Sequence, residues 1–400
     1  MASVFPFRAL RPTVASAARV AAVPYDVVSA DEARELAGGN PLSFLHVSRS
    51  EIDLPPGTDP YADLVYRTAA ERFDALKRSA PLVLEETPGV YFYRLTMGVH
   101  EQTGLAACYS MDEYDRDLIK KHERTRRDKE DDRTKHMLAL RAQTGPVFLT
   151  YRARVEIDDC AGRAGQAAPL FDFVAPDAVR HTIWRVDGAD LDRIVQSFAS
   201  VPFLYIADGH HRAASAARVR QQIGGEADTF LAVAFPHDQT QILPYNRVVK
   251  DLAGLSGDQF LAEVSARCTV AAGPAAPARS GEMGMYLAGR WYTVTFGASA
   301  TPASGVIASL DVSRLQQRLL EPVLKIADVR TDNRIDFVGG GRGTGALERM
   351  VDGGHAAVAF CLYPVSVQDL MQVADEGGIM PPKSTWFEPK LRDGLLSHVI

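Results

Sequence analysis

The sequence contains few cysteines. It has four in 400 residues, with no CxxC pair among them: Cys108, Cys160, Cys268 and Cys361. Disulfide frameworks and zinc ribbons need closer or patterned cysteines, so both are excluded and buried, reduced thiols are expected. No apolar run reaches the roughly 20 residues that cross a bilayer, and residues 1–28 have no signal-peptide pattern. We therefore expect a cytoplasmic protein without a membrane partner.

An excess of positive charge is also missing. Forty-four Lys and Arg stand against 50 Asp and Glu, which gives a net charge of −6 and argues against nucleic acid as a partner. With 46% hydrophobic and 24% charged residues, the composition is that of a globular protein and excludes long disorder. The length predicts at least two domains, an N-terminal one over residues 1–250 and a smaller C-terminal one over 251–400.

Short apolar runs alternate with helical patterns along the chain. This alternation predicts an α/β or α+β fold with mixed sheets and flanking helices. Ser29 and Glu32 predict a capping box at the start of a helix over residues 30–37. The charged segment 114–140 is expected to be one long helix or a pair of helices.

The sharpest local signal is the sequence DGHHR at residues 208–212. It follows the buried strand expected at Phe203–Ala207 and precedes the helix expected at Ala213–Gln222. Such a junction directs free amides and the positive end of a helix dipole at one point, which suits a phosphate. Gly209 permits close approach of the backbone, Arg212 can bind phosphate oxygens and Asp208 can hold Mg²⁺. Alternatively, His210 and His211 cap the helix and fill hydrogen bonds.

The second signal is the charged run at residues 119–136. A solvated helix face with i,i+4 ion pairs is one explanation. The other is a site that follows an apolar anchor, in which Glu123 acts as a general base. Basic side chains of the run would then contact an anionic substrate or nucleotide, together with its histidine: Lys121, His122, Arg124 and Arg133.

A third segment, MPPKSTWFEPK, covers residues 380–390. Lys383, Ser384 and Thr385 are placed to bind an anion, while the aromatic residues after them anchor the segment. A strap packed over the domain is the alternative. The glycine-rich residues 339–345 match neither GxGxxG nor a Walker loop, so they predict a turn.

Five segments in one order resemble a long bacterial and archaeal family, domain of unknown function 1015. Its members often carry the label SpoOJ/ParA/ParB/RepB family protein. The segments are PYDVV at 24–28, IKKHERTRRDKEDDR at 119–133, LYIADGHHR at 204–212, LPYNRVV at 243–249 and MPPKSTWFEPK at 380–390. The resemblance covers nearly the whole chain.

The DGHHR segment is also similar to the phosphate-binding loop of the ParB/sulfiredoxin superfamily. One branch of that superfamily consists of free serine kinases, which transfer a phosphoryl group from ADP or ATP to L-serine. The Asp, Gly, His and Arg of their motif correspond to Asp208, Gly209, His210 and Arg212, whereas His211 replaces a small polar residue. The resemblance implies a ParB/sulfiredoxin-like nucleotide-binding core.

Together these signals suggest a kinase for a small hydroxylated metabolite, with ATP or ADP and Mg²⁺ as cofactors. Asp208 would bind the metal, residues 209–212 would hold phosphates and Glu123 would accept the hydroxyl proton. Lys121, Arg124 and Lys383 would offset developing charge. Two alternatives stay open: a ParB-like nucleotide-binding or DNA-associated protein, and a hydrolase or lyase that uses the histidine pair, with His210 and His211 as catalytic residues. The oligomeric state is also open, a homodimer included.

Overall fold

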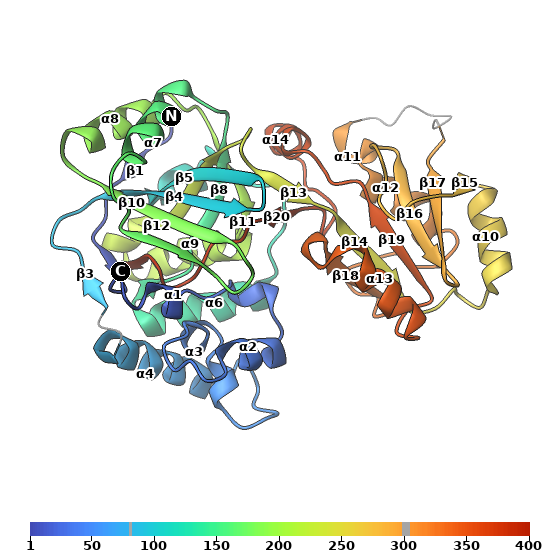
Figure 1. Cartoon of the computed structure of the whole chain (residues 1–400), viewed down its shortest axis with the longest axis horizontal. Coiled ribbons are helices and arrows are strands. Elements are labelled where there is room, and N and C mark those ends of the chain that lie inside the picture. Colours follow the sequence, from blue (N-terminus) through green and yellow to red (C-terminus); the bar gives the residue numbers. More distant parts are fainter. Residues whose placement is uncertain (80–81, 298–304) are drawn as a thin grey trace. The chain divides into compact units, whose positions relative to one another are not determined.

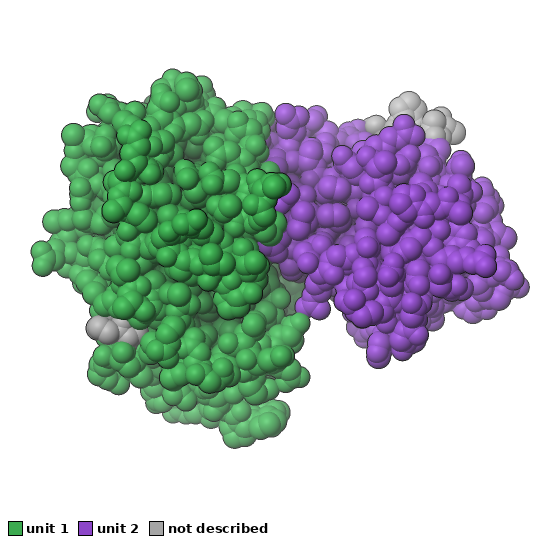
Figure 2. Space-filling view, viewed as in Figure 1, with its two compact units in different colours: residues 1–240, 389–400 green, residues 241–388 purple. Residues whose placement is uncertain are grey.

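The computed structural model describes residues 1–79, 82–297 and 305–400. The chain forms two compact units, Met1–Thr240 with Pro389–Ile400, and Gln241–Glu388 (Figures 1 and 2). The division falls between residues 240 and 241, where the sequence suggested 250 and 251, and the last residues return to the first unit. Along the chain, the second unit is therefore an insertion into the first.

The first unit is built on a mixed sheet of nine strands, which confirms the predicted mixed α/β architecture (Figure 1). Two neighbouring pairs, β6 with β11 and β8 with β12, are parallel, and the other pairs are antiparallel. The strand order is β6 (Ile119–Lys120), β11 (Leu204–Asp208), β8 (Val147–Tyr151), β12 (Thr229–Pro236), β5 (His100–Ser110), β4 (Val90–Met97), β10 (Arg180–Val186) and β9 (Phe171–Val174), and β1 (Val4–Phe5) pairs with β5.

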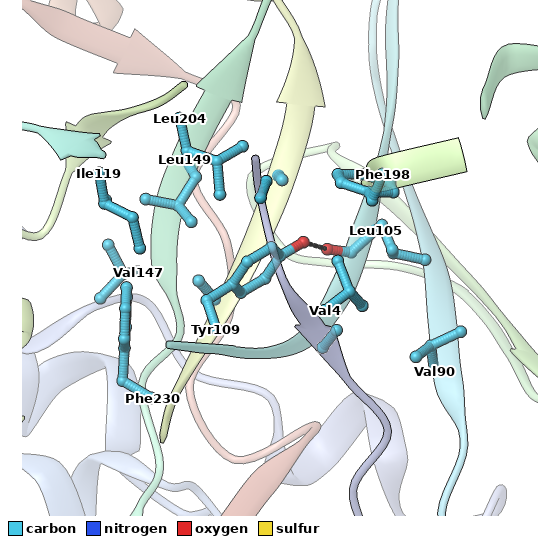
Figure 3. Close-up of a cluster of buried hydrophobic side chains, with 14 of the residues drawn as sticks. Val4, Val90, Leu105, Tyr109, Ile119, Val147, Leu149, Phe198, Leu204 and Phe230 are labelled. Carbon is cyan, nitrogen blue, oxygen red and sulfur yellow. Dashed lines mark hydrogen bonds between the residues drawn. The ribbon is translucent and has the colours of Figure 1, made fainter. Parts of the chain in front are cut away.

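Apolar runs in these strands form a buried core. Leu149, Leu204 and Phe230 come from three different strands and are at most 1% exposed (Figure 3). Helices after the strands add their apolar sides to the same cluster. They are α5 (Met111–Asp115), α6 (Arg127–Leu140), α7 (Val155–Ala164), α8 (Gly188–Phe198) and α9 (His210–Ile223).

Tyr109 brings a polar group into this core. Its hydroxyl donates a hydrogen bond to the Leu105 carbonyl at 2.9 Å (Figure 3). Replacing Tyr109 with Phe removes the donor from a buried site and leaves the shape of the ring unchanged. We expect Tyr109→Phe to lower the free energy of unfolding by about 1–2 kcal/mol. Urea denaturation measures the difference, and an unchanged midpoint would show that the bond contributes nothing to stability.

The N-terminal segment forms a second helical cluster of the first unit. Ser29 and Glu32 form the predicted capping box, since each side chain binds the other residue's amide, at 3.2 and 2.8 Å. The helices of this cluster pack around Phe44 and Phe73. They are α1 (Ala17–Val20), α2 (Ala30–Ala37), α3 (Leu45–Ser48) and α4 (Asp63–Ser79).

The last residues of the chain complete a small sheet in the first unit. Its order is β3 (Val83–Leu84), β2 (Ala9–Arg11), β21 (Ser397–Val399) and β7 (Ala142–Gln143). The C-terminal strand thus lies between strands from the start and the middle of the chain.

The second unit contains an antiparallel sheet of six strands and a two-stranded ribbon. The sheet order is β15 (Thr269–Ala272), β17 (Arg290–Thr295), β16 (Glu282–Leu287), β19 (Val358–Leu362), β14 (Tyr245–Val249) and β18 (Ile335–Gly339). The ribbon pairs β13 (Gln241–Leu243) with β20 (Trp386–Glu388), the two ends of the unit. The helices are α10 (Gly257–Ser265), α11 (Val306–Ser309), α12 (Asp311–Leu315), α13 (Gly343–Asp352) and α14 (Val367–Asp375).

The prediction of a helix or a pair of helices over residues 114–140 is wrong for the middle of that segment. Strand β6 interrupts it, and residues 121–126 form a loop before α6 begins at Arg127. The reason is tertiary: Ile119 is fully buried and pairs with Leu204, so this stretch joins the sheet despite its charged surroundings. The motif around Glu123 therefore lies on a loop.

All four cysteines are free and buried, as expected. Within residues 1–79, 82–297 and 305–400, every helix is too short or too polar to cross a bilayer.

Candidate functional site

The site begins with the parallel pairing of β6 and β11. Ile119 pairs with Leu204 and Lys120 with Tyr205, so both strands end at the same edge of the sheet. The loop 121–126 leaves β6 there, and the turn at residues 208–210 leaves β11 there. Two motifs that are distant in the sequence are consequently neighbours, at the kind of strand ends where α/β sheets bind ligands.

Gly209 shapes the turn between β11 and α9. Its φ of 96° lies in the left-handed region that favours glycine. A Cβ atom at this position would lie 2.9 Å from Nε of Arg212, closer than real contacts allow. Helix α9 begins at the next residue, and its N-cap Gly209 makes no side-chain hydrogen bond to the first turn.

Arg212 supports this turn from inside the protein. Its side chain is buried, one guanidinium nitrogen donates to the Pro146 carbonyl and another lies 3.9 Å from Asp208 Oδ2. The buried guanidinium thus lies directly against the Gly209 turn. The direct contact with phosphate oxygens expected for Arg212 stays a prediction.

Asp208 is a charged, partly accessible carboxylate at the end of β11. Its Oδ2 accepts a hydrogen bond from Lys390 Nζ at 3.1 Å, and the side chains of Asp208 and Lys390 are 28% and 11% exposed. Burial raises the pKa of Asp208, but the charges of Lys390 and Arg212 outweigh burial and hold it below its ordinary value. Asp208 is therefore ionised at neutral pH.

His122 and His210 form a buried pair beside Glu123. Their rings meet edge to face with centroids 4.5 Å apart, and Nδ1 of His210 lies 4.0 Å from Glu123 Oε2. Burial lowers the pKa of His122 to about 4, and burial with the neighbouring His122 lowers that of His210 well below its usual value. The His122 amide points at Nε2 of His210 at 3.5 Å. We accordingly assign the proton of His210 to Nδ1, where it faces the Glu123 carboxylate.

His211 has a different place from its neighbour. Its Nε2 accepts a hydrogen bond from the Arg126 amide at 3.0 Å, which ties the first turn of α9 to the start of α6. The two helices pack together further along, where Ser215 Oγ donates to the Glu130 carbonyl at 3.1 Å. His211 therefore makes a structural hydrogen bond at the start of the helix, as the alternative interpretation of the two histidines expected.

A pocket of about 260 Å³ opens at this edge of the sheet. It brings together four of the predicted side chains, three from the loop and one from α9: Lys121, Glu123, Arg124 and His210. Arg124 is the exposed one of the four. Tyr114 and Thr125 complete the lining and were not anticipated from the sequence. The volume suits a small polar molecule or part of a larger ligand.

Two predicted basic residues of the charged run have protein partners. Lys121 donates to the Tyr114 carbonyl at 3.0 Å and lies 3.6 Å from Asp117. Arg133 binds Asp132 at 2.9 Å, and its guanidinium lies 4.1 Å from the centroid of the Tyr25 ring. Arg133 does not line the pocket. It connects α6 with the PYDVV segment, which gives that segment a packing role.

Lys383, Ser384 and Thr385 belong to the second unit. There the Lys383 carbonyl accepts a hydrogen bond from the buried Arg247 at 3.0 Å, and Ser384 Oγ donates to the Pro381 carbonyl at 2.6 Å. Lys383 also has a positive φ of 57°, unusual for a residue with a side chain. The part of these three residues in an anion site stays a prediction.

The residues around Asp208 do not fit a resident metal site. Among the described residues, no group of three or more His, Cys, Asp and Glu side chains is arranged to hold a metal ion. A Mg²⁺ ion at Asp208 would share the carboxylate with two cations, Lys390 and Arg212, which repel it.

The sequence did not single out Lys390 or Asp393. Lys390 lies inside the MPPKSTWFEPK segment, in which the sequence predicts Lys383 and not Lys390 as an anion ligand. Asp393 is buried near Arg212, and burial raises its pKa to about 7. Its backbone exchanges hydrogen bonds with Ala22 at 2.9 and 3.2 Å, so the C-terminal segment is anchored beside the site.

Comparisons with known proteins give a family and distant structural similarities. A free serine kinase mutant in complex with AMP is similar at 14% identity and a TM-score of 0.36, over 70% of this chain and 90% of that chain. A conserved hypothetical protein from Pyrococcus furiosus is 14% identical with a TM-score of 0.34, over 71% of this chain and 93% of that chain. SbnI with a C-terminal truncation, from Staphylococcus aureus, is 11% identical with a TM-score of 0.39, over 74% of this chain and 87% of that chain. No curated protein matches the chain significantly.

The family model described as "Protein of unknown function (DUF1015)" matches residues 4–313. The match covers more than half of the 400 residues and includes the loop around Glu123 and the DGHHR turn. The chain belongs to the DUF1015 family.

Proposed function

We propose that this protein is a nucleotide-dependent phosphotransferase that acts on a small hydroxylated metabolite. The observation that carries the proposal is the pocket that Glu123, Lys121 and Arg124 line together with His210, the first residue of α9. A carboxylate and positive groups around uncapped helix amides are what phosphoryl transfer to an alcohol requires.

The nucleotide phosphates are assigned to the start of α9. The amides after Gly209 are not used by a side-chain cap, and the helix dipole favours negative charge there. Arg124 lines the pocket, and its exposed side chain can contact the phosphates. The buried Arg212 guanidinium, bound to the Pro146 carbonyl, packs against the turn.

Glu123 is assigned the role of general base. In the proposed step the substrate hydroxyl oxygen forms a bond to the terminal phosphorus, and the bond from that phosphorus to the nucleotide oxygen breaks. The hydroxyl proton moves to Glu123, whose carboxylate lies 4.0 Å from Nδ1 of the neutral His210.

The motif resemblance supports adenine nucleotides as donors and L-serine as the first acceptor to test. The pocket of about 260 Å³ is consistent with an acceptor of this size. Lys121 and Arg124 would bind an acceptor carboxylate as readily as a phosphate.

Product formation tests the proposal. Purified protein is incubated with ATP or ADP, with and without Mg²⁺, and with serine or one of a panel of small alcohols. We expect a phosphorylated alcohol, detected by ³¹P NMR, and a nucleotide-dependent rise in melting temperature of the same sample. If neither nucleotide raises the melting temperature and no alcohol is phosphorylated, the proposal is wrong.

A further inference from the structure

Lys390 enters the first unit directly after the insertion ends. Strand β20 finishes at Glu388, and the first unit resumes at Pro389. Lys390 therefore comes from a different part of the chain than the loop and turn that form the rest of the site. Its ammonium group nevertheless lies 3.1 Å from Asp208, one residue before the Gly209 turn.

The segment that carries Lys390 is held firmly. Arg392 is 3% exposed, donates to Nε2 of the buried His181 at 3.2 Å and also binds Asp177. Asp393 is joined to Ala22 through its backbone. A lysine side chain that is only 11% exposed and starts from such a segment has little freedom. Its position at Asp208 is built into the fold.

Two cations share the Asp208 carboxylate. Lys390 and Arg212 both lie within 4.0 Å of this one carboxylate. Asp393 and the exposed Asp26 also attract Arg212, but burial keeps Asp393 only partly ionised near pH 7. The charge of Arg212 is therefore offset by Asp26 and Asp393 as well as by Asp208. An ammonium has three N–H groups, so it can bind a carboxylate and a ligand oxygen together.

We propose that Lys390 binds a phosphate oxygen of the nucleotide while it holds the Asp208 carboxylate. This inference rests on the proposed function and adds to it a residue supplied by the segment that follows the insertion. The phosphates would then be held between the amides of α9 and the ammonium of Lys390.

Calorimetric titration of ADP and of adenosine into the full chain tests this contact. Adenosine lacks the phosphates, so it reports on the fold of the site and not on Lys390. We expect Lys390→Met to weaken ADP binding about 10- to 100-fold and to leave adenosine binding unchanged, with Lys390→Arg in between. Lys250→Met is the matched control, because it also removes a lysine that lies 3.0 Å from an aspartate, at a site that is 46% exposed.

Each result separates this contact from the proposed function. Suppose that wild type binds ADP. If Lys390→Met then binds ADP equally well, or loses the binding of ADP and adenosine alike, Lys390 does not contact phosphate. The proposed function stands in both cases. If wild type binds neither ADP nor ATP, both proposals fail. Lys390→Gln, which keeps a donor for Asp208 without the charge, replaces Lys390→Met in the same titrations if that variant does not fold.

Discussion

Replacing Glu123 with Gln is expected to lower kcat for phosphoryl transfer by about 10²- to 10⁴-fold, the usual contribution of a general base. The amide keeps the size of the side chain and its place in the pocket but cannot accept the hydroxyl proton. Nucleotide binding is therefore expected to persist, because the phosphates are assigned to α9 and not to Glu123. Steady-state rates and an ADP thermal-shift measurement on the same sample separate the two properties.

Glu156→Gln is the matched control for this prediction. Glu156 is exposed on α7, away from the pocket lining, and its replacement makes the same change of charge. Its kcat should equal that of wild type. A kcat for Glu123→Gln within twofold of wild type would rule out Glu123 as the base.

Replacing Gly209 with Ala is expected to lower the free energy of unfolding by about 2–5 kcal/mol. Two costs add: a left-handed backbone for a residue with a side chain, and a Cβ that would lie 2.9 Å from the Arg212 guanidinium. That guanidinium is bound to Pro146 and lies near Asp208, so it cannot move without breaking contacts. Displacement of the turn should also abolish nucleotide binding.

Gly98→Ala provides the comparison for Gly209→Ala. Gly98 also has a positive φ, of 59°, but a Cβ there would have no neighbour within 4 Å. It should lose only the backbone contribution, about 1–2 kcal/mol. Urea denaturation of both variants measures the difference, and equal losses would mean that Arg212 yields to the added carbon at no cost.

The sequence predicted the elements of the site better than their assembly. The apolar run before DGHHR and the alanine-rich stretch after it correctly indicated a strand and a helix, because both signals are local. The loop around Glu123 was assigned to a helix, since its charged residues have good helical propensity. What overrides that propensity is the pairing of Ile119 with Leu204, a contact between residues far apart in the chain.

The same reason explains why Lys390 was missed. Its partner Asp208 is 182 residues away, and nothing in the segment itself distinguishes Lys390 from Lys383. The C-terminal segment returns to the first unit because β21 pairs with β2 and β7. These strands are short and of mixed composition, so their pairing cannot be predicted from a local pattern. Contacts of this kind follow from the whole fold and not from a local pattern.

The central claim is that the turn after β11 binds nucleotide phosphates. A crystal structure of the protein with ADP tests it most directly. We predict the β-phosphate within hydrogen-bonding distance of the first amides of α9 and of Lys390 Nζ, with Glu123 open to the acceptor. A nucleotide bound elsewhere, with this turn in contact only with water, would contradict the account.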